Sequence, residues 1–312
     1  MKAFSRTIRM ILASAMAFSL AACGSSSAAA EPTASAATAA AEESASGNSG
    51  EVTVYMPSPS GLNEKYVSGF EAATGIKVNL FEGTTGEILA RLEAEKDNPV
   101  ADVVVLASWS DGLRMKKQGG LVSYPDAKNA DKLYDGWKDE DNMLFGTSAS
   151  ALGVIYNTTL IDSLDADWSA FEGMAANGMT VAGANKAALE TVLTGEKAIL
   201  VAGVDYNAYA NIAKGEPINI YYPASGTIIN PRPAMILSTA KNMDNAKAFI
   251  DYLMSDEAQK LVANAYLLPG RSDISCDNRT NVADIPQLDH DWSWMMDHAD
   301  DVAAKLVSIC QK

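Results

Sequence analysis

The sequence predicts an α/β fold, and three observations carry this prediction. Apolar stretches with strand-like alternation are separated by stretches with helical spacing, in the order strand, helix, strand, helix, strand between residues 51 and 107. With 48% apolar and 20% charged residues, the composition is that of a soluble globular protein. A length of 312 residues is enough for about two domains. The alternation favours a mostly parallel sheet with right-handed crossovers.

The first strand and helix follow from residue spacing. Residues 51–56 alternate as a strand does, residues 57–61 are rich in Pro, Ser and Gly and predict a turn, and residues 62–74 have helical spacing. Gly75 is expected to end the helix. The helix residues expected to face inward are Tyr66, Val67, Phe70 and Ala73.

The next elements repeat this order. Residues 76–81 predict a second strand, residues 82–86 a loop and residues 87–96 a second helix. A continuous apolar run over residues 102–107 predicts a buried strand. The inward residues of the second helix are expected to be Ile88, Leu89, Ala90 and Leu92.

The N-terminal segment has the layout of an export signal. In residues 1–22, Lys2, Arg6 and Arg9 precede an apolar run that is too short to span a bilayer permanently. The small residues before Cys23 resemble the bacterial lipobox, which implies a lipidated Cys23 thiol. Residues 23–50 are mainly Ala, Ser, Gly, Thr and Glu and predict a flexible tether. We therefore expect an extracytoplasmic protein anchored to the cell membrane by lipid.

The net charge argues against two kinds of binding surface, and the cysteines leave a disulfide open. The formal net charge of −15 and a pI near 4.5 argue against a nucleic-acid surface and against docking on anionic lipid through a basic patch. Besides Cys23, the chain holds Cys276 and Cys310. Outside the cytoplasm such a pair can form a disulfide, and two free thiols are the equally weighted alternative.

Side chains in the loops that follow the predicted strands suggest a binding site. In an open α/β sheet, ligands bind beyond the carboxyl ends of the strands, where helix N-termini offer free N–H groups to anions. Three hydroxyl-bearing loops on one sheet edge favour such a site. Ordinary helix caps and turns are the alternative for each loop taken singly. The residues concerned are Ser58, Ser60, Thr84, Thr85, Ser108 and Trp109.

Several segments together resemble one protein family. They include Phe70-Glu71-Ala72-Ala73-Thr74-Gly75-Ile76-Lys77-Val78, Pro99-Val100-Ala101-Asp102-Val103, Gly153-Val154-Ile155-Tyr156-Asn157 and Tyr222-Pro223-Ala224-Ser225-Gly226-Thr227. In this order they resemble the extracellular solute-binding proteins of ABC importers, most closely the ferric-iron, phosphonate and sugar-phosphate group. The resemblance covers nearly all of residues 51–274 and is specific for the family, not for the ligand.

The resemblance implies a two-lobed architecture of the type II periplasmic-binding-protein kind, with two crossing strands as a hinge. We place the crossings near residues 144–157 and 226–238. The expected divisions are lobe 1 over residues 51–145 and 234–270, lobe 2 over residues 146–233, and a C-terminal helical segment over residues 271–312. The family also implies a monomer without a cofactor, which binds a small-molecule solute and works with ABC permease and ATPase subunits.

One part of the chain departs from the family pattern. After the Tyr156-Asn157 motif, the family has a strand and a Ser-Gly turn that opens a helix, and residues 160–176 show neither. About forty residues of lobe 2 are therefore expected to be missing, the length of a strand–helix unit. An internal deletion is favoured by the abrupt run at residues 167–172, and a remodelled smaller lobe is the alternative. A lost strand would leave its neighbours with exposed apolar surface and weaken ligand affinity and stability.

The ligand predicted from these residues is a small anionic solute, such as a phosphonate, an organophosphate or a sugar phosphate. Hydroxyl donors in the strand-end loops, with Ser225 and Thr227, suit phosphoryl oxygens. The resemblance places Asn185 and Tyr206 near the bound solute, beside Asp205. No Arg stands in these loops, although Arg is the usual phosphate clamp.

Other ligands stay open at this point. In a ferric-iron site, Glu87, Asp205 and Tyr206 would supply oxygen ligands, although the family's second tyrosine is absent. A thiamine-like ligand is a further alternative within the family. A deleted variant that no longer binds any solute is the third.

The absence of known catalytic motifs from the sequence argues against an enzyme. The sequence lacks the Gly-x-Ser-x-Gly, His-Glu-x-x-His and phosphate-binding-loop signatures, and Ser238-Thr239-Ala240-Lys241 has none of the companion motifs of penicillin-interacting enzymes. His290 and His298 lie in an acidic run over residues 289–301, for which a solvated helix is favoured over a metal site. Its inward residues are expected to be Trp292, Met295, Met296 and Val302.

Overall fold

The computed structural model describes residues 50–57, 59–165, 167–182 and 184–310. The predicted signal peptide, Cys23 and all of the predicted tether except Gly50 lie outside the described residues. Within the described residues, no helix is long and apolar enough to cross a membrane.

Strands and helices alternate along the first part of the chain, as predicted. The strands are β1 (Glu51–Met56), β2 (Lys77–Glu82), β3 (Val103–Val105), β4 (Phe145–Asn157), β5 (Ile199–Val204), β6 (Ile218–Tyr221), β7 (Ile229–Ile236) and β8 (Leu268–Pro269). The α-helices are α1 (Ser60–Thr74), α2 (Thr85–Ala94), α3 (Trp109–Lys117), α4 (Phe171–Ala176), α5 (Asn185–Leu193), α6 (Asp205–Ile212), α7 (Met243–Leu253), α8 (Asp256–Asn264), α9 (Trp292–Asp297) and α10 (Ala299–Cys310). Short 3-10 turns lie at Ala130–Lys132, Trp168–Ala170 and Val282–Asp284.

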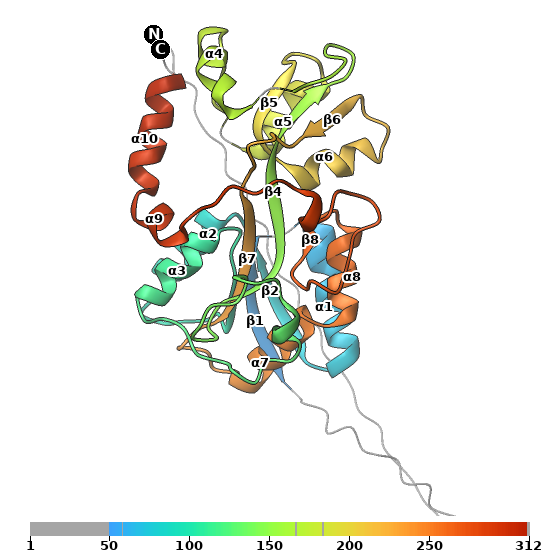
Figure 1. Ribbon diagram of the computed structural model, residues 1–312. Helices are drawn as coiled ribbons and strands as arrows, with labels where there is room; N and C mark the ends of the chain where they lie inside the picture. Colours follow the sequence, from blue (N-terminus) through green and yellow to red (C-terminus); the bar gives the residue numbers. More distant parts are fainter. Residues whose placement is uncertain (1–49, 58, 166, 183, 311–312) are drawn as a thin grey trace, which may run out of the picture. The chain divides into compact units, whose positions relative to one another are not determined.

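The strands form two sheets that share β4 (Figure 1). In the first sheet the order is β2-β1-β3-β7-β4, with β1 parallel to β2 and β3, and β7 antiparallel to β3 and β4. In the second sheet, the C-terminal half of β4 pairs antiparallel with β5 and with β6. We call the parts built on these sheets the first lobe and the second lobe. The predicted parallel strand–helix–strand order is confirmed for β1, β2 and β3, but the prediction of a mostly parallel sheet is wrong, because the strands that follow pair antiparallel.

Alternation along the strands builds the core of the first lobe. Val52 and Val54 of β1 pack on the face covered by α1, α7 and α8, whereas Tyr55 packs on the face covered by α2 and α3. Helix α1 buries Tyr66 and Phe70 as predicted. Ala73 and Ala90 are exposed, against the prediction. Ala73 lies in the last turn of α1, and Ala90 lies two residues beyond the buried Ile88, on the opposite side of α2.

Two long strands, β4 and β7, connect the lobes and lie where the crossing strands were predicted. A third segment, residues 271–288, packs against them. The Thr227 N–H donates to the Pro286 carbonyl at 2.8 Å, and the Leu288 N–H donates to the Thr227 carbonyl at 3.0 Å. This close approach requires glycine at position 226, where φ is +102° and an added Cβ would lie 2.7 Å from the Gln287 carbonyl carbon.

The second lobe is small. Among the described residues between 160 and 176 there is no strand, in agreement with the sequence pattern. Leu160 and Val181 leave 54% and 62% of their surface exposed. Strand β5 pairs with β4 along one edge, and its residues 199–202 are half-buried or exposed.

The C-terminal part contains a buried thiol and a divided helix. Cys276 is a buried free thiol, as in the free-thiol alternative of the two that the sequence left open. The acidic run predicted as one solvated helix divides into α9 and α10, separated at His298. In it Trp292, Met295 and Met296 are half-buried, but Val302 is 51% exposed because α10 extends past the first lobe instead of packing on it.

Candidate functional site

A cavity of about 750 Å³ lies between the two lobes, beside β4 and β7. Four parts of the chain line it: strand-end loops of the first lobe, the crossing strands, the second lobe, and helices α9 and α10. The lining residues are Pro57, Thr84, Thr85, Ala107, Ser108, Ser110, Asp111, Arg114, Ser150, Leu152, Asn185, Val204, Tyr206, Ile228, Asn230, Arg232, Trp292, Trp294, Met295, Ala299, Asp300 and Val302.

The polar wall of this cavity is built from two helix N-termini of the first lobe. The Thr84 hydroxyl accepts from the Glu87 N–H at 3.2 Å, and the Glu87 carboxylate accepts from the Thr84 N–H at 2.7 Å, which forms a capping box for α2. The Ser108 hydroxyl accepts from the Asp111 N–H at 3.3 Å and caps α3. These residues are helix caps that also line the cavity, so the positive ends of α2 and α3 lie beside it.

A buried cation stands in the same cavity wall. Arg232 of β7 is only 4% exposed, yet it forms no salt bridge with any described residue. Its Nη1 donates to the Pro57 carbonyl at 2.9 Å, and its guanidinium lies 5.3 Å from the centre of the Tyr206 ring. Its Nε has no hydrogen-bond partner among the described residues. A buried, unpaired guanidinium is costly unless an anion is bound to it.

The other charged groups that line the cavity are either paired or exposed to solvent. Arg114 Nη1 forms an ion pair with Asp111 Oδ1 at 2.8 Å, so this cation is already compensated. Asp300 lies exposed to solvent in the first turn of α10. Among the described residues of this wall, Arg232 is therefore the cation that has no anionic partner.

The structure brings some of the predicted site residues together and separates others. Thr84, Thr85, Ser108, Asn185 and Tyr206 line the cavity. The remaining predicted residues have other surroundings: the Trp109 ring is buried between α3 and the first sheet, Ser225 donates to Asp167, and Thr227 is buried and donates to the Leu152 carbonyl at 2.6 Å. Ser58 lies outside the described residues, and Ser60 begins α1.

Asp205 was expected to lie beside the solute, but in the structure it is paired with Arg279. Its carboxylate forms a fully buried ion pair with Arg279 and accepts from the Tyr222 hydroxyl at 3.1 Å. Burial raises the pKa of Tyr222, so the Tyr222 phenol stays protonated and can donate to Asp205. Asp205 is not among the cavity residues, and we leave it out of the site proposed below.

The expected iron ligands are not assembled at the cavity either. The Glu87 carboxylate is held by the backbone N–H of Thr84, which lowers its pKa, and Asp205 is paired with Arg279. Of the three, Tyr206 lines the cavity. The described part of the chain contains no cluster of three or more His, Cys, Asp or Glu side chains suited to a metal ion.

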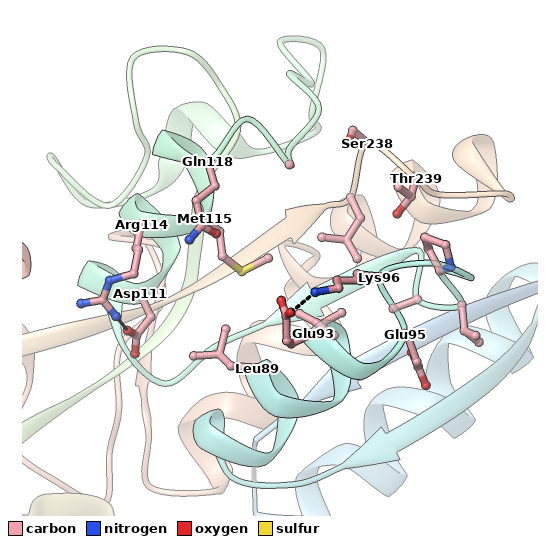
Figure 2. A pocket seen from close by; sticks show the side chains of 16 residues that line it. Leu89, Glu93, Glu95, Lys96, Asp111, Arg114, Met115, Gln118, Ser238 and Thr239 are labelled. Carbon is pink, nitrogen blue, oxygen red and sulfur yellow. Dashed lines mark hydrogen bonds and ion pairs between the residues drawn. The ribbon is translucent and has the colours of Figure 1, made fainter.

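A second pocket, of about 460 Å³, lies on the first lobe between α2 and α3 (Figure 2). Its charged side chains all have partners: Lys96 with Glu93, Arg114 with Asp111, and Glu95 with Arg91, which lies outside the lining. Because these charges are already balanced, this pocket offers less to an ion than the cavity between the lobes.

Sequence reasoning missed Arg232 because it examined the loops after the strands. Arg232 stands within a crossing strand, in the run Ile229-Asn-Pro-Arg-Pro-Ala-Met-Ile236. A single charge in a mostly apolar strand is the signal that could have found it, since charged residues are rarely buried without a partner. Asn230 of the same strand was missed for the same reason; its Oδ1 accepts from the Trp109 N–H at 3.0 Å.

Comparison with known proteins identifies similar sequences. Two family models, both described as bacterial extracellular solute-binding protein, match residues 65–177 and 163–294. The chain is 24% identical to the Iron uptake protein A1 of Synechocystis, with 72% of this chain and 76% of the relative covered. It is 26% identical to a putative 2-aminoethylphosphonate-binding periplasmic protein of Salmonella typhimurium, with 82% and 89% covered.

Solved structures share the fold. The periplasmic binding protein AfuA of Actinobacillus pleuropneumoniae, with fructose-6-phosphate bound, superposes with a TM-score of 0.70 at 19% identity, covering 84% of this chain and 99% of AfuA. Iron-bound HitA of Pseudomonas aeruginosa superposes with a TM-score of 0.70 at 18% identity, covering 83% and 99%. These similarities show the two-lobed periplasmic-binding-protein fold.

The relatives carry residues that this chain lacks. The match to Iron uptake protein A1 runs over 275 residues but uses 72% of the 312 residues here, about 225, which leaves about 50 positions without a counterpart. The two family-model matches overlap within residues 163–177, at the place where a strand–helix unit was predicted to be missing. The missing unit stays a prediction, and this difference in length supports it.

Proposed function

This chain belongs to the bacterial extracellular solute-binding proteins, and we propose that it captures a small anionic solute between its two lobes and delivers it to an ABC permease. Members of this family bind solutes and carry out no chemistry on them, and we extend that role to this chain. We also propose that Cys23 carries a lipid that holds the protein at the outer side of the cell membrane.

One observation carries the choice of an anionic solute: the buried Arg232 has an unpartnered Nε and no described carboxylate beside it. An anion that entered the cavity would supply the missing partner and meet the N-termini of α2 and α3 on the same wall. The hydroxyls of Thr85, Ser110 and Ser150 add donors around it. The expected anionic group is therefore a phosphonate, a phosphate monoester or a group of similar shape.

The test is calorimetric titration of the full chain with methylphosphonate, glucose-6-phosphate, inorganic phosphate, thiamine and ferric citrate. Saturating binding of a phosphonate or phosphate ester is the expected result. A solute at 100 times its Kd should also raise the melting temperature by roughly 5–10 °C, because it binds the native state alone. Tight binding of iron with no binding of phosphonate or phosphate would replace this proposal with the iron alternative, and no binding at all would favour a deleted variant without a solute.

Arg232→Met should weaken anion binding about 100-fold, the effect of truncating one partner of a buried charged contact. It should also raise the melting temperature of the solute-free chain, because it removes an uncompensated buried charge. A purely structural arginine would give the opposite change in melting temperature. Arg91→Met is the matched control, since Arg91 stacks on Phe81 on the first lobe and does not line the cavity.

A further inference from the structure

Helices α9 and α10 form a strap, residues 292–310, that reaches from the first lobe to the second (Figure 1). At one end, α9 packs against α3, where Trp292 joins the apolar cluster beneath that helix. Lys117 of α3 forms an ion pair with Asp297 of α9 at 3.3 Å. At the other end, α10 approaches α4, and Leu306 lines a pocket of the second lobe.

The strap contributes an apolar wall to the cavity between the lobes. Trp294, Met295, Ala299 and Val302 line the cavity from this side. Trp294 is 52% exposed and Val302 51% exposed, so both present apolar surface that no described side chain covers. The Trp294 ring is held in place by stacking on His298, with ring centres 4.5 Å apart.

The cavity therefore combines two chemistries. Arg232, the caps of α2 and α3 and the hydroxyls of the first lobe form its polar wall, and the strap supplies the apolar surface. A bare inorganic ion would satisfy the polar wall but would leave Trp294 and Val302 in contact with water. A molecule that has an anionic group and a carbon skeleton can satisfy both walls.

We propose that the strap is part of the solute site and that the solute is an organic anion, whose anionic group meets Arg232 and whose carbon skeleton packs on Trp294, Met295 and Val302. This inference rests on the proposed function. It also gives the small second lobe a partner in enclosing the solute, since Asn185, Val204 and Tyr206 are the residues that this lobe adds to the lining.

The experiment compares two ligands that share a phosphonate group and differ in carbon surface, methylphosphonate and phenylphosphonate, by calorimetry on the full chain. We expect phenylphosphonate to bind at least 10-fold more tightly. The double variant Trp294→Ala/Val302→Ala should abolish this preference, because phenylphosphonate should lose at least 10-fold more affinity than methylphosphonate. Val307→Ala is the matched control, because Val307 is 41% exposed on α10 but does not line the cavity.

The outcomes separate the two proposals. Equal binding of both phosphonates, or a preference that survives in the double variant, overturns the strap's role and leaves the anion site intact. Failure of the parent chain to bind either phosphonate overturns the proposed function and this inference with it. Arg232→Met should weaken both ligands by the same factor, which assigns the anionic end to Arg232 and the carbon end to the strap. Far-ultraviolet circular dichroism of the double variant checks that α10 is still helical.

Discussion

Each lobe is a sheet covered by helices, but the first lobe has a much larger apolar core than the second. In the first lobe, helices cover both faces of the sheet, and apolar clusters such as Val54 with Phe249 and Tyr55 with Trp109 lie on either side of it. In the second lobe, the buried cluster consists of Ile155, Leu189, Val192, Ala208 and Ile218. Since burial of apolar surface is the main force for folding, the first lobe carries most of the stability and the second lobe depends on its attachments.

Those attachments come from three places. Strand β4 continues from the first sheet into the second, the segment at residues 271–288 packs on the hinge, and the strap reaches the second lobe at α4. A lobe with a small core can therefore contribute to the proposed site when the rest of the chain braces it.

The largest effect is expected from opening a cavity in the first lobe. Phe249 is fully buried, with its ring 5.0 Å from that of Phe70, so Phe249→Ala should lower the free energy of unfolding by about 3–5 kcal/mol. Leu189→Ala in the second lobe should cost about 2–3 kcal/mol and act locally. Urea unfolding measures the first, and hydrogen exchange the second.

Hydrogen exchange can also contradict the proposed difference in stability between the lobes. Leu189→Ala should speed exchange in α5 and β5 and leave β1 and β3 protected, since the first lobe has its own core. If β1 and β3 lose protection to the same extent, the two lobes unfold as one unit, and the proposed difference in their stability is wrong.

How far the sequence could predict this fold depends on how local each interaction is. The elements from β1 to β3 follow from residue spacing, because each strand and helix buries a periodic face, whereas the start of α3 was assigned to a loop. The hinge strands β4 and β7 were placed by family resemblance and lie within a few residues of the prediction. The parallel pairing of β1 with β2 and β3 followed from the order of the elements.

The site was harder to predict because its key contacts are distant in sequence. Thr84 and Ser108 could be found because helix caps follow strands at fixed places. Asp205 was misplaced because its partner, Arg279, lies 74 residues further along the chain. Arg232 and the strap were missed for the same reason: no local pattern shows that β7 and α9 face one cavity. Which charges are compensated is a property of the folded chain.

The second prediction concerns the ion pair that joins the lobes. Arg279 Nη1 donates to the Tyr266 carbonyl of the first lobe at 2.7 Å, and Nη2 contacts Asp205 of the second lobe. Asp205→Asn leaves a buried guanidinium uncompensated and should lower the free energy of unfolding by about 3 kcal/mol. The double variant Asp205→Leu/Arg279→Met, measured by the same urea titration, should lose less, because it removes both charges.

An exposed ion pair provides the control for the buried one. Glu93→Gln breaks the exposed pair with Lys96 and should leave stability unchanged, which separates burial from charge pairing as such. If the double variant is as unstable as Asp205→Asn, the network with Tyr222 and Tyr209 contributes through its hydrogen bonds and packing, and the cost of an uncompensated charge is not the reason for the loss.

The smallest effect is expected from Cys276, in the segment that braces the hinge. Burial raises the pKa of its thiol from 9.0 to about 11. Between these values the unfolded chain releases the thiol proton and the folded chain retains it, so stability falls as pH rises from about 9 to about 11. The expected loss is about 1 kcal/mol at pH 10 relative to pH 8. Urea titrations at the two pH values measure the loss of stability. Cys276→Ala should remove the part of the loss that is due to the thiol. Any contribution of the tyrosines is the same in the parent chain and the variant. An identical pH dependence in parent and variant, or a Cys276–Cys310 disulfide in peptide mapping without reductant, would show that the thiol is not held as a buried, neutral group.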